Sequence, residues 1–496
     1  MAEKSYLAVD MGASSGRSVL GHFDGRSLRL EEIYRFENGP VQIADSIHWD
    51  LLSQWSHICQ GLRAAAKKTA GKIVSVGVDT WGVDFGLLGR NDELLGNPYH
   101  YRDDRTNGIL EKAFAIVPRQ DIFRHTALQF MQINTLYQLL AMKNVASPLL
   151  DAAQTLLMMP DLFHWLLTGI KCNEMTIAST SQCYNPLKAD WAFDLLEKFN
   201  LPAKIFGPIA QPGTVLGPLR KNIAAETGLH ATQVVLPGSH DTASAVMAVP
   251  SDSQTSIYPI WCYISLGTWA LLGIESPQPI VTDEVLDLNF TNEGGVGATT
   301  RLLKNITGLW LAQECRRIWN QSGEILSWED LNRLVSSSPP FCCFVDPDAS
   351  DFLAPGDMPQ AIRTYCHRTN QPVPDEKGKI LRCILESLAL KFRCILGLCE
   401  QLSGSCIETI HIVGGGVKNR WLCQAVADAC ARRVVAGPVE ATATGNVMMQ
   451  AIAAGDVASI AQAREIIRRS FDVEQYEPKN VEPWNEAYQR FLKVIG

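Results

Sequence analysis

Apolar residues along the chain alternate between short strand-like runs and longer stretches with helical spacing. Near the N-terminus, runs at 6–9 and 18–23 flank a turn of small residues, and a third run follows at 28–36. Short runs rich in Val, Leu, Ile and aromatic residues, separated by Gly and Ser, are typical of β-hairpins. We therefore predict that an antiparallel three-stranded meander opens the chain.

Later segments give a mixed α/β pattern. A helix is predicted over 51–68, and "KIVSVGVDTWGVDFGLLG" contains two strand-like runs with a break at 79–82. The middle third is mostly helical in pattern, and "VVLPGSHDTASAVMA" predicts a strand, a turn and a helix.

After residue 256 the order of predicted strands, turns and helices resembles that of the N-terminal half. The segment "WCYISLGTWALLGI" predicts strand, turn and strand, residues 379–402 predict a long packed helix, and "ETIHIVGGGVKNRWLC" predicts strand, turn and helix. This recurrence predicts two similar α/β domains, 1–249 and 250–496, with a linker over 249–256.

Composition and charge narrow the function classes. Charged residues make up 19% and hydrophobic residues 46% of the 496 positions, which is typical of a globular protein. The net charge of −8 argues against sequence-independent binding to nucleic acid, which requires a basic surface. The N-terminus lacks the apolar core of a signal peptide, and a cytoplasmic location is predicted. The uncharged stretch 253–274 contains Pro, Gly and hydroxyl residues, which favours two buried strands over a membrane span.

The 14 cysteines are scattered and show no zinc-binding spacing. We predict buried, reduced thiols, which pack like small apolar residues. The sequence leaves open a disulfide that involves Cys342, Cys343 or Cys366.

Three glycine-rich turns are candidate phosphate-binding loops. In "DMGASSGRS", Gly lacks the Cβ that blocks a close approach of phosphate, and Ser14, Ser15 and Arg17 add hydroxyl groups and a cation. Asp10 is a candidate ligand for Mg²⁺, which prefers oxygen donors. The spacing matches neither GxxxxGK[ST] nor GxGxxG, and a plain hairpin is the alternative. "SLGTW" (265–269) and "VGGGVKN" (413–419) are further candidates, and two such hairpins facing across a cleft can clamp a triphosphate.

Asp241 lies in "LPGSHDTASAV", where a strand ends and a helix begins. A catalytic triad from residues 239–241 is excluded, because consecutive side chains point in different directions and no GxSxG motif is present. A carboxylate with the ordinary pKa of about 3.9 is ionised at neutral pH. It can accept the proton of an attacking hydroxyl in phosphoryl transfer. A helix N-cap is the alternative role, and the two roles are compatible.

The segment "VDTWGVDFGLL" (78–88) mixes acidic and aromatic residues on a predicted strand–turn–strand. Trp81 and Phe85 are candidates to stack on the apolar face of a sugar, while Gly82 permits a close backbone approach. A β-hairpin with a packed Trp explains the segment without a ligand.

Together these motifs resemble those of the FGGY carbohydrate kinases, which share a superfamily of folds with Hsp70 and actin. The resemblance is carried by "VDMGASSGR", "VDTWGVDFGLL", "NPYHYRDDRT", "PGSHDTASAV", "SLGTWALLG", "KNITGLWLAQE", "HIVGGGVKN" and "AGPVEATATGN". It implies an α/β fold of two actin-like (ribonuclease H-like) domains, each with a five-stranded sheet, and a catalytic cleft between them. It also implies ATP-dependent phosphorylation of the C1 hydroxyl of a ketose, with L-rhamnulose as the preferred substrate and Mg²⁺ as cofactor.

The same resemblance assigns roles position by position. It implies Asp241 as the proton acceptor and Asp10 as an acid associated with Mg²⁺. Positions implied to bind ATP are Ala13, Ser14, Ser15, Gly16, Arg17, Thr268, Gln313 and Gly415. Positions implied to bind the sugar are Gly82, His240, Asp241, Thr242 and Asn305. Asp104 and Leu266 depart from the family pattern without removing a chemical group, although Leu266 can alter the packing beneath the second loop.

Other functions stay open on the sequence alone. L-fuculose or another ketose is the nearest alternative substrate, and a non-catalytic sugar or nucleotide sensor is an alternative of a different class. The combination of Asp10, Arg17 and Asp241 weighs against a sensor. The expected partners are a ketose and ATP, without nucleic acid or membrane, and the protein is expected to be a monomer or a dimer.

Overall fold

The structure, a computed structural model, describes residues 3–251, 257–353 and 356–496. It consists of two compact units that interleave along the chain. The first unit combines Met1–Thr255, Glu275–Leu302 and Ala441–Phe471, and the second combines Ser256–Ile274, Leu303–Glu440 and Asp472–Gly496. The chain thus enters the first unit three times, whereas the predicted division at 249/250 cuts it once. As a boundary between functional domains, that division stays a prediction, and most of the linker predicted over 249–256 lies outside the described residues.

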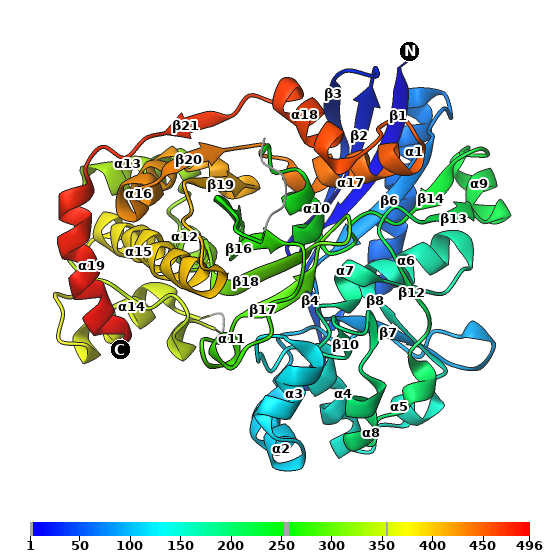
Figure 1. Cartoon of the computed structure of the whole chain (residues 1–496), viewed down its shortest axis with the longest axis horizontal. Coiled ribbons are helices and arrows are strands. Elements are labelled where there is room, and N and C mark those ends of the chain that lie inside the picture. The colour runs from blue at the N-terminus through cyan, green and yellow to red at the C-terminus, as the bar shows by residue number, and fades with distance from the viewer. Residues whose placement is uncertain (1–2, 252–256, 354–355) are drawn as a thin grey trace. The chain divides into compact units, whose positions relative to one another are not determined.

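The first unit is built on a six-stranded sheet in the order β13-β14-β6-β1-β2-β3 (Figure 1). Its strands are β1 Lys4–Met11, β2 Ser15–Phe23, β3 Leu28–Glu37, β6 Ser75–Thr80, β13 Val215–Pro218 and β14 Gln233–Val235. Strands β1, β2 and β3 form the predicted antiparallel meander, while β1, β6 and β14 run parallel. The carboxyl ends of these three parallel strands therefore meet at one edge of the sheet.

Helices cover both faces of this sheet. They are α1 Leu51–Thr69, α6 Met159–Thr168, α9 Lys221–Thr227, α10 Asp241–Met247, α17 Ala441–Ala453 and α18 Ile460–Ser470. Helix α1 approaches β2 so closely that a Cβ on Gly61 would lie 2.0 Å from Ser18 Oγ. Helix α17 lies on the opposite face, where a Cβ on Gly21 would lie 2.5 Å from Val447. Ser18 and Gly21 are three residues apart on one strand, so they point to opposite faces.

A second apolar core of the first unit lies outside the sheet, among helices between residues 85 and 206. These helices are α2 Ile109–Ile116, α3 Arg119–Thr126, α4 Thr135–Asn144, α5 Pro148–Ala152, α7 Met175–Ala178 and α8 Phe193–Lys198. Short strand pairs accompany them: β4 Pro40–Ile43 with β5 Ser46–Trp49, β7 Phe85–Leu88 with β8 Thr155–Met158, β9 Asn173–Glu174 with β12 Ile209–Ala210, and β10 Tyr184–Asn185 with β11 Asp190–Trp191. Helix α11, Asp283–Asp287, also belongs to this unit.

The second large sheet has the order β17-β18-β16-β15-β19-β20-β21. Its strands are β15 Trp261–Leu266, β16 Trp269–Ser276, β17 Thr291–Gly294, β18 Thr300–Thr307, β19 Thr409–Val413, β20 Arg433–Ala436 and β21 Glu474–Tyr476. The helices of the second unit are α12 Trp310–Gln321, α13 Trp328–Ser337, α14 Met358–Arg368, α15 Lys377–Ser403, α16 Arg420–Cys430 and α19 Val481–Ile495. The described part of the chain also contains five short 3₁₀ turns: Arg90–Asp92, Asp104–Thr106, Ala203–Ile205, Ser350–Phe352 and Gly415–Lys418.

The two sheets repeat one layout, as the sequence predicts. The order β3-β2-β1-β6-β14 in the first corresponds to β18-β16-β15-β19-β20 in the second, with an antiparallel hairpin followed by parallel neighbours in each. Each sheet contains the expected five strands but also further edge strands, β13 in one and β17 and β21 in the other. Strands β13 and β17 precede the strands with which they pair, whereas β21 is added from the C-terminal part of the chain.

Residues 261–274 of the uncharged stretch lie in the β15–β16 hairpin, as predicted, and its first four residues lie outside the described part of the chain. No helix among the described residues is long and apolar enough to cross a membrane. All cysteines of the described chain are free, and most are buried, as predicted. Cys343, Cys366 and Cys383 gather with their sulfur atoms within 4.8 Å of one another.

Candidate active site

Three aspartates lie at the carboxyl ends of the parallel strands of the first sheet. Asp10 is the penultimate residue of β1, Asp79 is the penultimate residue of β6, and the two are register partners. Asp241 follows β14, and the bridge between Thr80 and His240 holds it at the same edge. Open α/β sheets bind their ligands at this edge. The fold therefore gathers three acids where a ligand is expected.

Asp79 is the most deeply buried of the three acids. Its side chain is fully buried, and its Oδ2 atom accepts a hydrogen bond of 2.5 Å from Asn446 on α17. Its Oδ1 atom has no hydrogen-bond partner among the described residues. Burial, reinforced by the negative charge of Asp10, raises the pKa of Asp79 well above its ordinary value. The Asp79 carboxyl group is therefore held towards its protonated, neutral form.

Asp10 has a positively charged partner instead. Arg17, its register partner on β2, donates from Nη2 and Nε to Asp10 Oδ2 over 2.6 and 3.0 Å. The Asp10 side chain is 9% exposed and that of Arg17 is 20% exposed. The pair thus combines a carboxylate and a guanidinium at the mouth of the first glycine-rich turn.

Asp241 is the first residue of α10, and its side chain is 31% exposed. His240 is the residue before the helix, so the N-cap role considered for Asp241 is not the one that it takes. Thr242 Oγ1 donates to Asp241 Oδ1 over 3.1 Å, and His240 Nε2 lies 3.4 Å from the same oxygen. Burial raises the pKa of Asp241, and the charge of Asp10 raises it further. The expectation of an ordinary pKa at Asp241 is therefore corrected upward, because protein atoms replace part of the water around this partly exposed carboxylate, although His240 opposes the shift.

The turn that carries Asp241 is fixed by buried hydrogen bonds that it donates to residues at the start of α7. The backbone N–H of Ser239 donates to Glu174 Oε2 over 3.1 Å, and that of His240 donates to Thr176 Oγ1 over 3.2 Å. Glu174 also caps α7 through the backbone N–H groups of Thr176 and Ile177. Burial raises the pKa of Glu174 to about 7, although these donors oppose the shift. The backbone is consequently anchored at both residues that precede Asp241.

The first glycine-rich turn joins β1 to β2 and lies beside these acids. Gly12 N–H donates to Ser15 O over 2.9 Å, and Asn38 Nδ2 donates to Gly12 O over 2.8 Å. Ser14 is exposed, Ala13 and Ser15 are partly exposed, and Gly16 is buried under the ring of Phe36. The turn is thus a closed hairpin whose tip residues face solvent.

The sequence-based role for two aromatic side chains is wrong. Trp81 and Phe85 are each only 6% exposed. Trp81 packs on Trp49 with ring centroids 4.0 Å apart and donates from Nε1 to Asp84 over 3.0 Å. Phe85 belongs to the second apolar core of the first unit. Both rings are therefore used for packing and are not available to stack on a sugar, whereas Gly82, between them, is partly exposed.

In the second unit, two of the expected nucleotide positions contact each other. Thr268, in the β15–β16 turn, donates from Oγ1 to Gln313 Oε1 on α12 over 3.1 Å. Gly415 is exposed in the turn after β19, where a Cβ would meet no atom within 4 Å. Leu266 packs under this turn, since a Cβ on Gly416 would lie 2.2 Å from it. The departure from the family pattern at Leu266 is thus absorbed by a neighbouring glycine.

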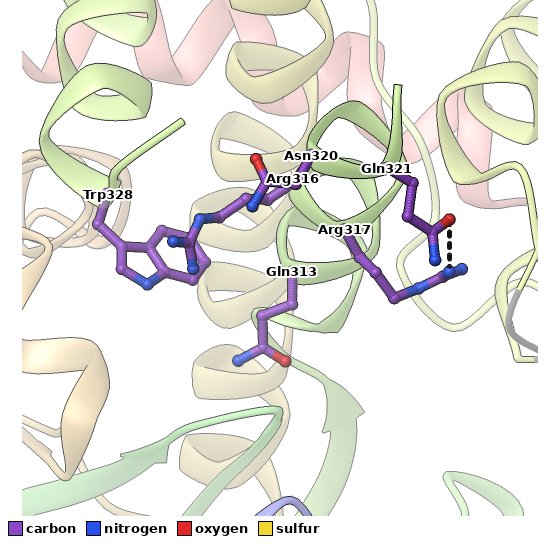
Figure 2. Close-up of a pocket in the computed structure, with 6 residues that line it drawn as sticks. All are labelled: Gln313, Arg316, Arg317, Asn320, Gln321 and Trp328. Atoms are coloured by element: carbon purple, nitrogen blue, oxygen red, sulfur yellow. Dashed lines mark hydrogen bonds between the residues drawn. The ribbon is translucent and has the colours of Figure 1, made fainter. Parts of the chain in front are cut away.

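Gln313 also lines an open pocket on the second unit (Figure 2). The other lining residues are Arg316, Arg317, Asn320, Gln321 and Trp328. Figure 2 shows the Arg316 guanidinium beside the ring of Trp328, with 4.9 Å between its central carbon and the ring centroid. Asn305, the remaining expected sugar position, lies on β18 and is partly exposed.

Two family models match this arrangement along the chain. The N-terminal domain of the FGGY family of carbohydrate kinases matches residues 5–248, and the C-terminal domain of that family matches residues 262–454. The chain belongs to the FGGY family of carbohydrate kinases. It is therefore an enzyme, a sugar kinase, as the motifs predict.

Curated relatives of this kinase extend over its whole length. A rhamnulokinase of Bacteroides thetaiotaomicron is 42% identical over 493 residues, which cover 99% of the chain and 100% of the relative. A rhamnulokinase of Bacillus subtilis is 37% identical over 478 residues, which cover 96% of each chain.

Solved structures show the same fold at low sequence identity. The ligand-bound xylulose kinase of Lactobacillus acidophilus matches with a TM-score of 0.80 and 16% identity, over 99% of this chain and 97% of that one. Plasmodium falciparum glycerol kinase with ADP matches with a TM-score of 0.76 and 14% identity over 99% and 98%. The predicted two-domain α/β fold is confirmed, and the cleft between the domains stays a prediction.

Sequence reasoning missed two residues at the acidic edge of this kinase, Asp79 and Asn446. A signal for Asp79 was present, because "LAVD" and "VGVD" both end an apolar strand run with Asp. Two such strands running in parallel bring their last residues together. Asn446 had no comparable signal, because its contact with Asp79 joins positions 367 residues apart.

Proposed function

We propose that this kinase transfers the γ-phosphoryl group of ATP to the C1 hydroxyl of L-rhamnulose, with Asp241 as the general base. The observation that carries the proposal is the partly exposed Asp241 carboxylate at the sheet edge, beside His240 and close to Asp10. The substrate is suggested by the curated relatives, which are rhamnulokinases and match this chain over nearly their full lengths.

In the proposed reaction Asp241 accepts the proton of the ketose C1 hydroxyl. The hydroxyl oxygen forms a bond to the γ-phosphorus, the bond to the bridging oxygen breaks, and ADP leaves with the electron pair. The transition state of phosphoryl transfer is loose, so the base chiefly orients the hydroxyl and takes its proton late. Gly82, His240, Thr242 and Asn305 are proposed as contacts to the sugar.

Two groups of residues are proposed to hold ATP. Those in the first unit are Ala13, Ser14, Ser15, Gly16 and Arg17, and those in the second unit are Thr268, Gln313 and Gly415. Exposed backbone and hydroxyl donors at a glycine-rich turn suit phosphate oxygens. The contact between Thr268 and Gln313 supports a shared role for these two side chains.

Mg²⁺ is the proposed cofactor, and Asp10 is the residue proposed to hold it. The fit rests on a carboxylate that is nearly buried at the sheet edge and has a second carboxyl group as its register partner. Arg17 bonds to Asp10 Oδ2, so Asp10 would hold the ion through its other oxygen, Oδ1, directly or through water. When bound, the ion neutralises negative charge on the transferring phosphates.

The test is ADP release with Mg·ATP and a panel of acceptors: L-rhamnulose, L-fuculose, L-xylulose, D-xylulose and glycerol. We expect the highest kcat/KM with L-rhamnulose. A higher value with another ketose would keep the mechanism and replace the substrate. No turnover with any acceptor, while ATP still binds, would favour a sugar or nucleotide sensor.

The base assignment is tested with Asp241→Asn, which keeps the shape of the side chain but cannot accept the proton. Loss of a positioned base lowers kcat by about 100- to 10,000-fold, while ATP binding is expected to persist. The matched control is Asp45→Asn, an acid-to-amide change at an exposed turn, which is expected to retain full activity. Wild-type turnover in Asp241→Asn would show that another group is the base.

A further inference from the structure

Arg301 is a fully buried arginine that reaches His240 from the start of β18. Its Nε atom donates to the backbone oxygen of Gly294 over 2.9 Å, which fixes the plane of the guanidinium group. Its Nη2 atom lies 3.1 Å from His240 Nδ1. Glu293 Oε2 lies 3.3 Å from both of these nitrogen atoms and balances the charge of Arg301. All of these residues belong to the first unit.

The contact between Arg301 and His240 determines which ring nitrogen carries the proton. A guanidinium group only donates hydrogen bonds and does not lose its proton in proteins. His240 Nδ1 must therefore accept from Arg301, and a neutral ring then has its proton on Nε2. Nε2 is the ring nitrogen on the side of Asp241, 3.4 Å from Oδ1.

We propose that Arg301, with Glu293 as its counter-ion, is a positioning residue that holds His240 as an Nε2–H donor beside Asp241. This inference rests on the proposed function of Asp241 as the base. His240 Nε2–H then lies on the side of Asp241, 3.4 Å from Oδ1, and Thr242 Oγ1–H donates to the same oxygen over 3.1 Å. The other carboxylate oxygen, Oδ2, is the one that accepts the proton of the ketose hydroxyl.

Stability alone does not explain a buried arginine at this place. Buried ion pairs contribute little net stability, because removing both charges from water is costly. The Nη1 atom of Arg301 adds to that cost, since it has no hydrogen-bond partner among the described residues. Positioning of His240 is a functional reason for a buried arginine at this place.

Arg464 provides a matched comparison within the same unit. It is also buried, bonds to Glu275 over 2.9 Å, and donates to the backbone oxygens of Val246 and Met247. These hydrogen bonds of Arg464 join a carboxylate to the end of α10, away from the His240 ring at its start. Arg464→Met therefore reports the effect of removing a buried arginine from this unit without disturbing the histidine ring.

The kinetic test compares Arg301→Met, Arg464→Met, His240→Ala and the two double variants with His240→Ala. We expect Arg301→Met to lower kcat about 100-fold, the loss typical of a misplaced reacting group, with KM for ATP unchanged. In the His240→Ala background the same substitution is expected to have no further effect, because Arg301 acts through His240. Arg464→Met is expected to have the same small effect in both backgrounds.

The spectroscopic test reads the ring directly and does not depend on turnover. Histidines labelled with ¹⁵N give different imidazole shifts for Nδ1–H and Nε2–H rings, and the His240 signal is identified by its loss in His240→Ala. We expect an Nε2–H ring in the wild type and a mixture of tautomers in Arg301→Met. Arg301→Lys keeps the charge but not the fork of donors, so it serves as a second variant if Arg301→Met does not fold, and we expect it to lower kcat by an intermediate amount.

Three results would overturn the inference: an Nδ1–H or doubly protonated ring in the wild type, equal losses of kcat in Arg301→Met and Arg464→Met, or an undiminished effect of Arg301→Met in the His240→Ala background. These outcomes are distinct from failure of the proposed function. Absence of ketose phosphorylation by the wild type would refute the role of Asp241, whereas the tautomer of His240 is measured independently.

Discussion

Asp10 and Asp79 are register partners on the neighbouring parallel strands β1 and β6, yet they have opposite kinds of partner. Asp10 bonds to the guanidinium group of Arg17, whereas Asp79 bonds to the neutral amide of Asn446. Two carboxylates side by side repel each other, and burial of one of them adds to the cost of its charge. The sheet edge therefore pairs Asp10 with a cation, while the raised pKa of Asp79 holds that carboxyl group towards its neutral form.

Replacing Asp79 by Asn is expected to flatten the dependence of stability on pH. The folded-state pKa of Asp79 is raised, so its contribution to stability is full below the ordinary aspartate range and is lost as the pH rises towards the folded value. Asn does not titrate. Between the ordinary aspartate pKa and the raised pKa of Asp79, the free energy of unfolding of the variant should therefore rise relative to that of the wild type by up to about 1.4 kcal/mol per pH unit. Urea unfolding from pH 5 to pH 8 measures this difference. A constant difference across the range would contradict a raised pKa, and Asp45→Asn serves as the exposed control.

As the pH is lowered, the activity of the kinase is expected to begin to fall at a higher pH than it would if the base were an aspartate with an ordinary pKa. The proposed base, Asp241, can accept a proton only when it is ionised, and its pKa is raised by burial and by Asp10. Values of kcat/KM for the ketose should be constant at high pH and fall tenfold per pH unit below the raised pKa. The control is the affinity for ATP over the same range, which should not follow this curve. Full activity retained down to about pH 4, the range of an unperturbed aspartate, would show that Asp241 is not the titrating base.

Helix α17 is expected to tolerate no side chain at Gly445. A Cβ there would lie 1.8 Å from the backbone oxygen of Ser244, on the helix α10 that begins with Asp241. Gly445→Ala should destabilise the protein by about 1–3 kcal/mol through overpacking and lower kcat by displacing α10. Gly397→Ala is the matched control in the middle of α15, because a Cβ there would meet no atom within 4 Å. It should stabilise the protein by about 0.5–1 kcal/mol, and thermal unfolding together with ADP release compares the two.

Gln313 is expected to affect the KM for ATP, and Gln321 is not. Both lie on α12 and line the pocket of Figure 2, but only Gln313 accepts the hydrogen bond from Thr268. Gln313→Ala should raise the KM for ATP about 2- to 10-fold, the value of one net hydrogen bond. Thr268→Ala should have a similar effect, and the two should not add. If Gln321→Ala raised this KM equally, the nucleotide would occupy the pocket as a whole instead of the Thr268 side.

Local pattern determined much of this protein. The strand–turn–strand at the N-terminus, the helix that begins near Leu51 and the β15–β16 hairpin are all predictable, because alternation of apolar residues and glycine turns acts over a few residues. The same local signals located Asp10, Arg17 and Asp241, since each lies where an apolar run meets a glycine-rich or small-residue turn. The motifs themselves also carried the family resemblance.

Only the tertiary structure decided which of these residues contact each other and how their pKa values shift. Register between β1 and β6 paired Asp10 with Asp79, and the return of the chain after residue 440 brought Asn446 to Asp79. Burial makes the Trp81 ring unavailable for stacking on a sugar, and it raises the pKa of Asp241. The chain pattern encodes what each segment can form, but solvent exclusion and contacts between distant segments depend on the packed fold, and these set the charge and orientation of the site.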